Sequence, residues 1–128
     1  MTLDSSVLLA ILFSEGGSLD LVDRIIEADV VRVGTPTLVE TAIVLASRRG
    51  EPSIKEVSRL VEELGVTVVP FGAAEWEAAA TAHDRFGRGR HAAALNFGDC
   101  LAYAVAATSS DSLLFVGNDF AKTDIQKA

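Results

Sequence analysis

Apolar positions in this chain recur with two kinds of spacing, and turn-forming residues separate them. Leu19, Val22 and Ile26 follow the three- to four-residue interval of an amphipathic helix. Short β-branched runs such as 66–69, which a proline closes, instead indicate strands. The pattern predicts strands at 2–3, 30–33, 66–69 and 113–116, and helices at 7–13, 19–28, 36–49, 54–64, 73–86 and 99–107.

Residues that favour helix ends mark several of these boundaries. Ser5 or Ser6 is predicted to cap the first helix with its hydroxyl. Thr35 is predicted as the N-cap of the third helix, because the proline that follows it suits the first helical position. The spacing of Ser53 and Glu56 predicts a capping box at the start of the fourth helix.

Strands alternate with helices along the whole chain, with no repeat or low-complexity segment between them. Successive strands joined through helices run parallel, and the crossovers place helices on both faces of the sheet. The fold class predicted is therefore α/β, with three α/β/α layers around a mostly parallel sheet of four to five strands. Residues 1–128 are expected to form one domain.

Composition supports a folded, water-soluble domain. Hydrophobic residues make up 49% of the 128 residues, and there are only three prolines, which argues against disorder. The longest apolar runs are too short to span a membrane, and no secretory signal pattern opens the chain. The single cysteine excludes an intrachain disulfide and fits a reducing cytoplasm, where we expect the protein to reside.

The formal net charge of −7 argues against a general affinity for nucleic acid, because phosphates repel an acidic surface. Positive charge is nevertheless clustered at two places. Arg85, Arg88 and Arg90 lie in one glycine-rich loop, and Arg48 and Arg49 end the third helix. The loop arginines are candidate RNA contacts, with a solvated surface turn as the alternative.

Four acids are placed where the predicted strands end or the next helices begin: Asp4, Glu40, Asp99 and Asp119. Because the carboxyl ends of parallel strands share one edge of a sheet, these side chains can converge there. Crowded carboxylates repel one another unless a cation keeps them ionised. Oxygen ligands alone favour Mg²⁺, or Mn²⁺ in its place, over zinc. Two such ions roughly 4 Å apart would support phosphodiester hydrolysis.

Each acid also has an ordinary structural alternative. Asp4 and Asp99 are both placed to cap or to open a helix. Glu40 interrupts an apolar helix face and suits a salt bridge to an arginine. Asp119 is placed to cap a short helix at Phe120.

Other chemically distinctive residues favour structural roles. Cys100, with His83 and His91 in the same half of the chain, suggests a thiol nucleophile. The adjacent acid would raise the pKa of the thiol, however, and a buried cysteine usually serves as a small apolar residue. Trp76 and Tyr103 are predicted to lie in the core or at a subunit interface.

Four motifs in order give the chain a family resemblance. They read TLDSS at residue 2, TPTLVE at residue 35, LNFGDCLAYAVA at residue 95 and LFVGNDF at residue 114. Together they resemble the motifs of PIN-domain ribonucleases, most closely the VapC toxins of bacterial toxin–antitoxin pairs, over essentially the whole chain.

The resemblance implies a PIN-like fold and a Mg²⁺-dependent endoribonuclease that cleaves structured RNA such as tRNA. It implies that Asp4, Glu40, Asp99 and Asp119 are the catalytic, metal-binding acids. Ser6 would support a site carboxylate, as in the family's Asp-x-Ser motif, and Asn118 and Asp124 are further supporting candidates. The expected partners are a VapB-type antitoxin and a second copy of the chain, in a homodimer and a toxin–antitoxin hetero-oligomer.

Two other functions fit parts of the sequence. A phosphoacceptor signalling domain would use paired acids after the first strand and a lysine after a late strand. The chain offers only Asp4 at the first position, and Lys122 is a loose candidate for the lysine. A catalytically silent PIN-fold binding module would act only through protein contacts, and the intact set of four acids argues against it.

Overall fold

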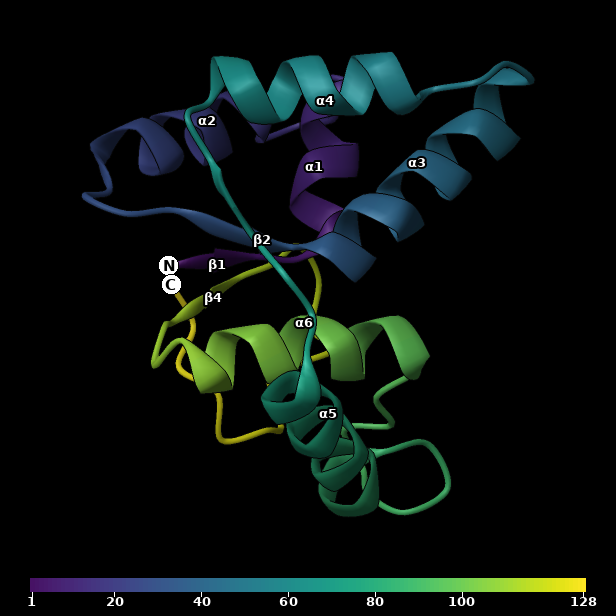
Figure 1. The fold of residues 1–128 in the computed structure, drawn as a ribbon, viewed down its shortest axis with the longest axis vertical. Coiled ribbons are helices and arrows are strands. Elements are labelled where there is room, and N and C mark those ends of the chain that lie inside the picture. The colour runs from purple at the N-terminus through teal and green to yellow at the C-terminus, as the bar shows by residue number, and fades with distance from the viewer.

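The computed structural model describes residues 1–128 and contains four short strands and six helices (Figure 1). The strands are β1 (Thr2–Leu3), β2 (Arg32–Gly34), β3 (Thr67–Val69) and β4 (Leu113–Leu114). The helices are α1 (Ser5–Leu12), α2 (Ser18–Glu27), α3 (Thr35–Arg49), α4 (Ile54–Glu63), α5 (Ala73–Phe86) and α6 (Phe97–Thr108).

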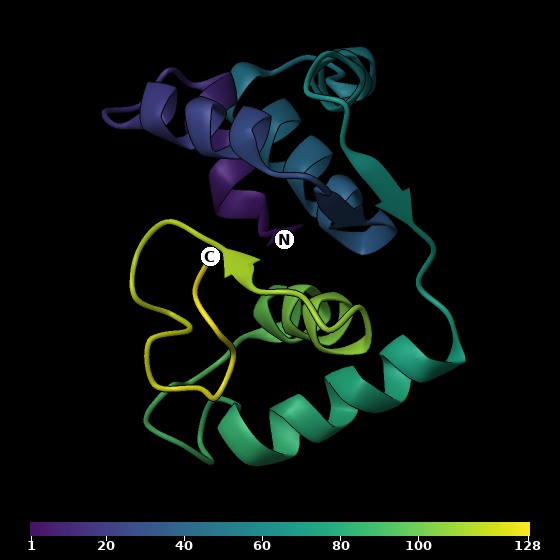
Figure 2. The ribbon, with the colours of Figure 1, turned by 90° about the vertical axis from the view of Figure 1, so that its left-hand side faces the viewer.

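The strands form one sheet in the order β3-β2-β1-β4, and every pair is parallel. Helices α1 to α4 lie on one side of this sheet and α5 and α6 on the other (Figure 2). The predicted α/β/α layering is therefore confirmed, with four strands. β1 has the predicted bounds, and the other three strands are shorter than predicted. Val116, for example, lies outside β4, and its backbone N–H bonds to the Ser6 hydroxyl.

Each face of the sheet has its own apolar core. Leu3, Val33 and Leu114 pack with residues of α1, α2 and α4 on one face. On the other face the small residues of α6 pack with α5 and with Phe115 and Phe120. Leu113 of β4 belongs to one core and Leu114 to the other, so β4 is held between the two packed layers.

Helix α6 lies very close to the sheet. A Cβ atom on Gly34, the last residue of β2, would lie 2.7 Å from Cγ2 of Val105. Ala102, Ala104 and Ala106 are fully buried beside it, and their small side chains permit this approach. The alanine-rich run therefore brings the latter part of α6 against the end of β2.

Three predicted helix caps are wrong. Asp4, rather than Ser5 or Ser6, caps α1, since its carboxylate accepts the backbone N–H of Ser6. Gly34 occupies the N-cap position of α3, so Thr35 is already helical. The Ser53 hydroxyl donates to the Ala42 carbonyl on α3 instead of forming the predicted capping box.

Two further differences concern the surface and the C-terminus. Trp76 is 58% exposed and does not lie in the core, whereas Tyr103 is buried. The last residues return to the sheet, where Lys127 pairs in parallel with Leu113, so the C-terminus lies beside β4 (Figure 2). No helix has the combination of length and apolar composition needed to cross a lipid bilayer.

Candidate active site

Three of the four predicted acids follow the carboxyl ends of neighbouring strands, and the fourth begins a helix. Asp4 directly follows β1, and Glu40 lies in α3, which begins immediately after β2. Asp99 is in the first turn of α6, and Asp119 is in the loop after β4. Because β2, β1 and β4 are adjacent and parallel, three of these acids lie beyond the same edge of the sheet.

Asp4 is almost completely buried, with 6% of its surface exposed. Its Oδ2 atom accepts two hydrogen bonds from Ser6, from the backbone N–H at 3.0 Å and from the hydroxyl at 2.5 Å. No hydrogen bond engages its Oδ1 atom. Burial raises the pKa of Asp4 above its ordinary value, and the charge of Asp119 raises it further. Capping α1 therefore orients this carboxylate and leaves one oxygen available.

Asp99 is held in the same way at the start of α6. Its Oδ2 accepts the Asn96 backbone N–H at 2.8 Å, while the Asn96 side chain accepts the Asp99 N–H at 2.9 Å. Burial raises the pKa of Asp99, and the charges of Asp4 and Asp119 add to that increase. Here too the cap uses one carboxylate oxygen and leaves Oδ1 without a hydrogen bond. The Asp99 carboxylate therefore both stabilises the start of α6 and remains available as an acid of the site.

Glu40 faces the start of α6 from α3. A Cβ on Gly98 would lie 2.5 Å from its Oε1 atom, so only glycine leaves room for this carboxylate. Burial raises the pKa of Glu40, and the charges of Asp4 and Asp99 raise it further. No arginine forms a salt bridge with Glu40, so the structural alternative considered for it is wrong.

Asp119 is the exposed member of the set and lies in a loop of turns. No helix starts at Phe120, so the predicted alternative of a helix cap is wrong. Asp119 lies close enough to the other acids that its negative charge raises the pKa values of Asp4 and Asp99.

The donor set suits a hard divalent cation, because it consists entirely of carboxylate oxygens. The side chains act on one another through their charges, yet no three His, Cys, Asp or Glu side chains form a group that could hold a metal ion as they stand. A bound cation would offset the repulsion that raises the pKa values of the buried members. By the chemistry of its donors, the site fits such an ion.

Of the three supporting candidates, Ser6 forms a hydrogen bond with an acid of the site, whereas Asn118 and Asp124 do not. The Ser6 hydroxyl links Asp4 to the loop after β4, since it also accepts the Val116 N–H at 3.0 Å. Asn118 is exposed, and only its backbone carbonyl is engaged, by Ala121. Asp124 accepts hydrogen bonds from Tyr103 and Arg85, and it forms no hydrogen bond with any of the four acids.

The prediction of one arginine loop is wrong for Arg85, which lies in the last turn of α5; only Arg88 and Arg90 lie in the loop. The three arginines also differ in their partners. Arg85 pairs with Asp124 at 2.7 Å and Arg90 with Asp84 at 3.5 Å. Arg88 has no ion pair, and its charge partly offsets the raised pKa of Asp99. Arg88 is therefore the free cation of this loop. The alternative cluster is already engaged, with Arg48 near Glu15 and Arg49 bound to Glu56.

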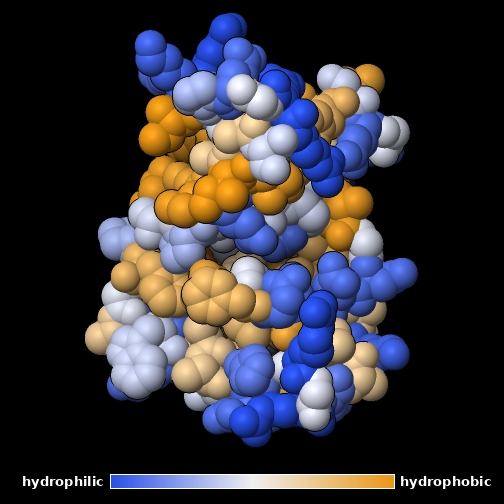
Figure 3. Space-filling view, turned by 90° about the vertical axis from the view of Figure 1, so that its right-hand side faces the viewer, coloured by the Kyte–Doolittle hydropathy of each residue, from blue (hydrophilic) through white to orange (hydrophobic).

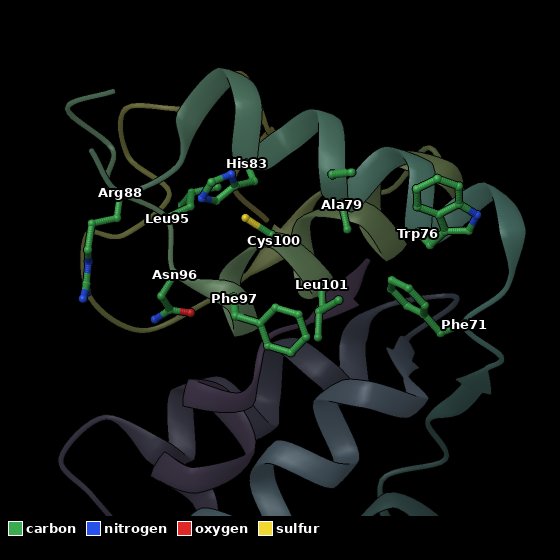
Figure 4. Close-up of a pocket in the computed structure, with 11 residues that line it drawn as sticks. Phe71, Trp76, Ala79, His83, Arg88, Leu95, Asn96, Phe97, Cys100 and Leu101 are labelled. Carbon is green, nitrogen blue, oxygen red and sulfur yellow. The ribbon is translucent and has the colours of Figure 1, made fainter. Parts of the chain in front are cut away.

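An apolar groove of about 650 Å³ opens beside Asp99, between α5 and α6 (Figure 4). Arg88 and Asn96 lie at one end of it, and Phe71 and Trp76 lie at the other. Phe97, the first residue of α6, is 80% exposed at its rim. Cys100 lies inside the groove, and its thiol pKa is raised by burial and then by Asp99, which disfavours a thiolate nucleophile.

Sequence reasoning missed two residues of this site. Asn96 was identifiable, because an asparagine three positions before an acid at a helix start is a capping signal. Gly98 stands inside the motif that begins at Leu95, but its close contact with Glu40 joins residues 58 positions apart and has no local signature.

Comparison with known proteins places the chain among relatives of matching length. The PIN domain family matches residues 1–126. Ribonuclease VapC of Mycolicibacterium smegmatis is 41% identical over 126 residues, covering 98% of this chain and 97% of that protein. Ribonuclease VapC30 of Mycobacterium tuberculosis is 39% identical over 98% of this chain and 95% of that protein.

Solved structures share the fold at lower identity. Mycobacterium tuberculosis VapC20, described as a sarcin–ricin loop cleaving toxin, superposes with a TM-score of 0.76 at 18% identity, covering 99% of this chain and 97% of that one. A toxin–antitoxin complex from Klebsiella pneumoniae gives a TM-score of 0.72 at 13% identity, covering 96% and 92%. The full-length match in sequence and the shared fold agree: the chain belongs to the PIN-domain family and, within it, to the VapC ribonucleases.

Proposed function

We propose that this protein is the toxin of a VapBC pair, a metal-dependent endoribonuclease whose site is built by Asp4, Glu40, Asp99 and Asp119. One observation carries the proposal. Asp4 is buried and Glu40 and Asp99 are half-buried, and burial raises the pKa of all three; in each case the charge of another member of the set contributes. Burying carboxylates together is unfavourable unless something positive joins them.

The four carboxylates would hold one or two Mg²⁺ ions, with Mn²⁺ able to substitute. A divalent ion in such a site lowers the pKa of bound water and stabilises developing negative charge. The protein's own contribution is to fix the ligands beforehand. Ser6 binds one carboxylate oxygen of Asp4, and Asn96 binds one carboxylate oxygen of Asp99. The other oxygen of each acid remains available. Gly98 supplies the space in which Glu40 approaches them.

The substrate proposed is structured RNA such as tRNA, cut to a 5′-phosphate and a 3′-hydroxyl. An acidic protein needs local rather than general attraction for a polyanion, and cations in the site would supply part of it. Arg88 is the unpaired side chain beside Asp99 that could contact a phosphate. Arg85 and Arg90, whose charges are already paired, are weaker candidates for the same role.

The partners proposed are a VapB-type antitoxin and a second copy of the chain. Several exposed large apolar side chains line three grooves that share residues: Val39, Ile43, Ile54, Trp76 and Phe97. Figure 3 shows apolar residues gathered in a band on the face that presents α3 and the start of α6. Grooves of about 770 Å³ and 640 Å³ meet at Val39 and Ile43. Exposed apolar area of this kind is typical of a protein interface.

The test is RNA cleavage by the purified protein in the presence and absence of Mg²⁺. We expect cleavage with Mg²⁺, none with a chelator, and none from Asp99→Asn, which keeps the capping geometry but loses the charge. Glu63→Gln is the matched control, because Glu63 lies on the exposed face of α4 and pairs only with Arg59. Cleavage by Asp99→Asn at the unmodified rate would overturn the proposed site. A protein that cuts no RNA but still binds its antitoxin would indicate the silent binding module instead.

A further inference from the structure

The segment after β4 carries Asp119 on a loop that is closed at both ends. Phe120 is 2% exposed and packs against Phe115, with ring centroids 5.0 Å apart, so the middle of the loop is anchored in the core. The chain then returns to the sheet, where Lys127 pairs with Leu113 (Figure 2). Asp119 itself remains exposed, and its position depends on what holds the loop around it.

The first end of this loop is tied to the residue that orients Asp4. The Val116 backbone N–H donates to the Ser6 hydroxyl at 3.0 Å, and that hydroxyl donates to Asp4 at 2.5 Å. The start of the loop and the Asp4 carboxylate therefore share one hydrogen-bonded side chain.

The second end is tied to the helix that carries Asp99. The buried Tyr103 hydroxyl donates to Oδ1 of Asp124 at 2.6 Å, and Arg85 donates to Oδ2 at 2.7 Å. Burial raises the pKa of Tyr103 to about 12, so its hydroxyl stays protonated and able to donate near neutral pH. Tyr103 lies four residues after Asp99 in α6, one turn along the same side of the helix.

We propose that Asp124, held by Tyr103 and Arg85, is a positioning residue that fixes the Asp119 loop relative to Asp99 and so sets the affinity of the site for divalent cations. The inference rests on the proposed function, since it assumes that Asp119 serves as a ligand. Both oxygens of Asp124 are already engaged, so it supports the site from outside and is not itself a ligand.

The arrangement predicts a change in binding rather than in folding. The Arg85–Asp124 pair is about half exposed, and exposed ion pairs contribute little to stability. The same pair should matter more for cation binding, because Asp119 on a loosened loop must be ordered each time a cation binds. Groups that orient metal ligands typically change metal affinity by about 10- to 100-fold when removed.

The experiment measures Mn²⁺ binding to the full-length protein by calorimetry, together with the melting temperature of the metal-free protein. Tyr103→Phe removes only the hydroxyl, and Asp124→Asn removes the charge. Asp84→Asn is the matched control, because Asp84 is also an exposed aspartate paired with an arginine, Arg90. We expect Tyr103→Phe and Asp124→Asn to weaken Mn²⁺ binding on the order of 10-fold or more, and Asp84→Asn to leave it unchanged.

The variants separate this inference from its competitors. If Asp124 were a ligand, Asp124→Asn would lose Mn²⁺ while Tyr103→Phe bound it normally, and the inference would be wrong. If both variants bind Mn²⁺ like the unmodified protein while Asp99→Asn does not, the network is structural only and the proposed function stands. If Asp99→Asn also binds normally, or the unmodified protein binds no Mn²⁺, the proposed function fails and this inference fails with it. Should Asp124→Asn not fold, Tyr103→Phe alone decides.

Discussion

The carboxylate of Glu40 lies against the α-carbon of Gly98, so closely that a single added methyl group would overlap it. The ideal Cβ position at Gly98 is 2.5 Å from Oε1, 2.7 Å from Oε2 and 2.8 Å from Cδ of Glu40. Gly98 directly precedes Asp99 in the first turn of α6. The glycine is therefore what allows an acid on α3 and an acid on α6 to share one site.

Gly98→Ala should impair RNA cleavage more than it impairs folding. Glu40 is only half buried, so its side chain can turn outward and relieve the contact. Overpacking of this kind costs about 1–3 kcal/mol when no side chain can move, and less when one can. Turning outward, however, removes Glu40 from Asp4 and Asp99. Cleavage rate and melting temperature, measured on the same preparations, compare the two effects.

Two companions make the Gly98 test specific. Gly16→Ala places the same methyl group where no atom lies within 4 Å, and it should leave cleavage unchanged. Gly98→Ala combined with Glu40→Asp shortens the acid and should recover any lost melting temperature. A Gly98→Ala enzyme with full activity would show that the Glu40 position does not matter for cleavage.

Much of the fold was predictable, because helix and strand spacing is a local property. All six helices and four strands occur where the apolar pattern placed them, within a few residues at the ends. The predicted capping box at Ser53 and the predicted end of β4 failed because distant groups compete: the Ser53 hydroxyl bonds to Ala42 on another helix, and the Val116 N–H bonds to Ser6. The exposure of Trp76 and the return of Lys127 to β4 also depend on long-range packing, which periodicity does not report.

The candidate site likewise combines residues that local sequence identifies with contacts that depend on long-range packing. Asp4 and Asp99 were identifiable from their places at strand and helix ends, and the structural role considered for each, a helix cap, is also real. Asp124 was expected to support the site directly. Its actual partners, Tyr103 and Arg85, lie 21 and 39 residues away in the chain, and nothing in the local sequence identifies them.

Divalent cations should raise the melting temperature of the protein. A cation that binds only the folded chain stabilises it by about 2.7 kcal/mol at 100 times its dissociation constant. For a domain of this size that corresponds to a shift of roughly 10 °C. Asp99→Asn should reduce the shift, and Glu63→Gln should not. An unmodified protein with the same melting temperature in Mg²⁺ and in chelator would contradict a shared acidic site.

Without metal, stability should fall as the pH rises from weakly acidic toward neutral. The folded-state pKa values of Asp4, Asp99 and Glu40 are raised above their ordinary values of 3.8, 3.8 and 4.5. An acid that holds its proton more tightly when folded favours folding while it is protonated. That stability is lost as the pH rises from the ordinary value through the raised one.

Melting temperatures measured in chelator at several values between about pH 5 and about pH 8 test the sign of this dependence. Asp99→Asn should flatten the slope by removing one of the three raised groups. Asp124, whose pKa is lowered mainly by the Tyr103 hydroxyl, acts outside this range. Its contribution to the stability of the folded protein is present above pH 3.8 and is lost only as the pH falls below that value. A slope that Asp99→Asn leaves unchanged would show that the acids do not crowd one another.

Arg88→Ala should weaken RNA binding, and Arg90→Ala should have a smaller effect. Arg88 has no ion pair and lies beside Asp99, whereas Arg90 is paired with Asp84 at 3.5 Å. A free cation that contacts a phosphate releases a counterion, so its loss should flatten the salt dependence of binding. The expected change is about 0.7 in the slope of log affinity against log salt for one phosphate on single-stranded RNA. Binding is measured in the Asp99→Asn background at two salt concentrations, so that no RNA is cut. Equal isotherms for the two arginine variants would show that Arg88 is a solvated surface residue. The attraction of this acidic chain for RNA would then have to come from bound cations.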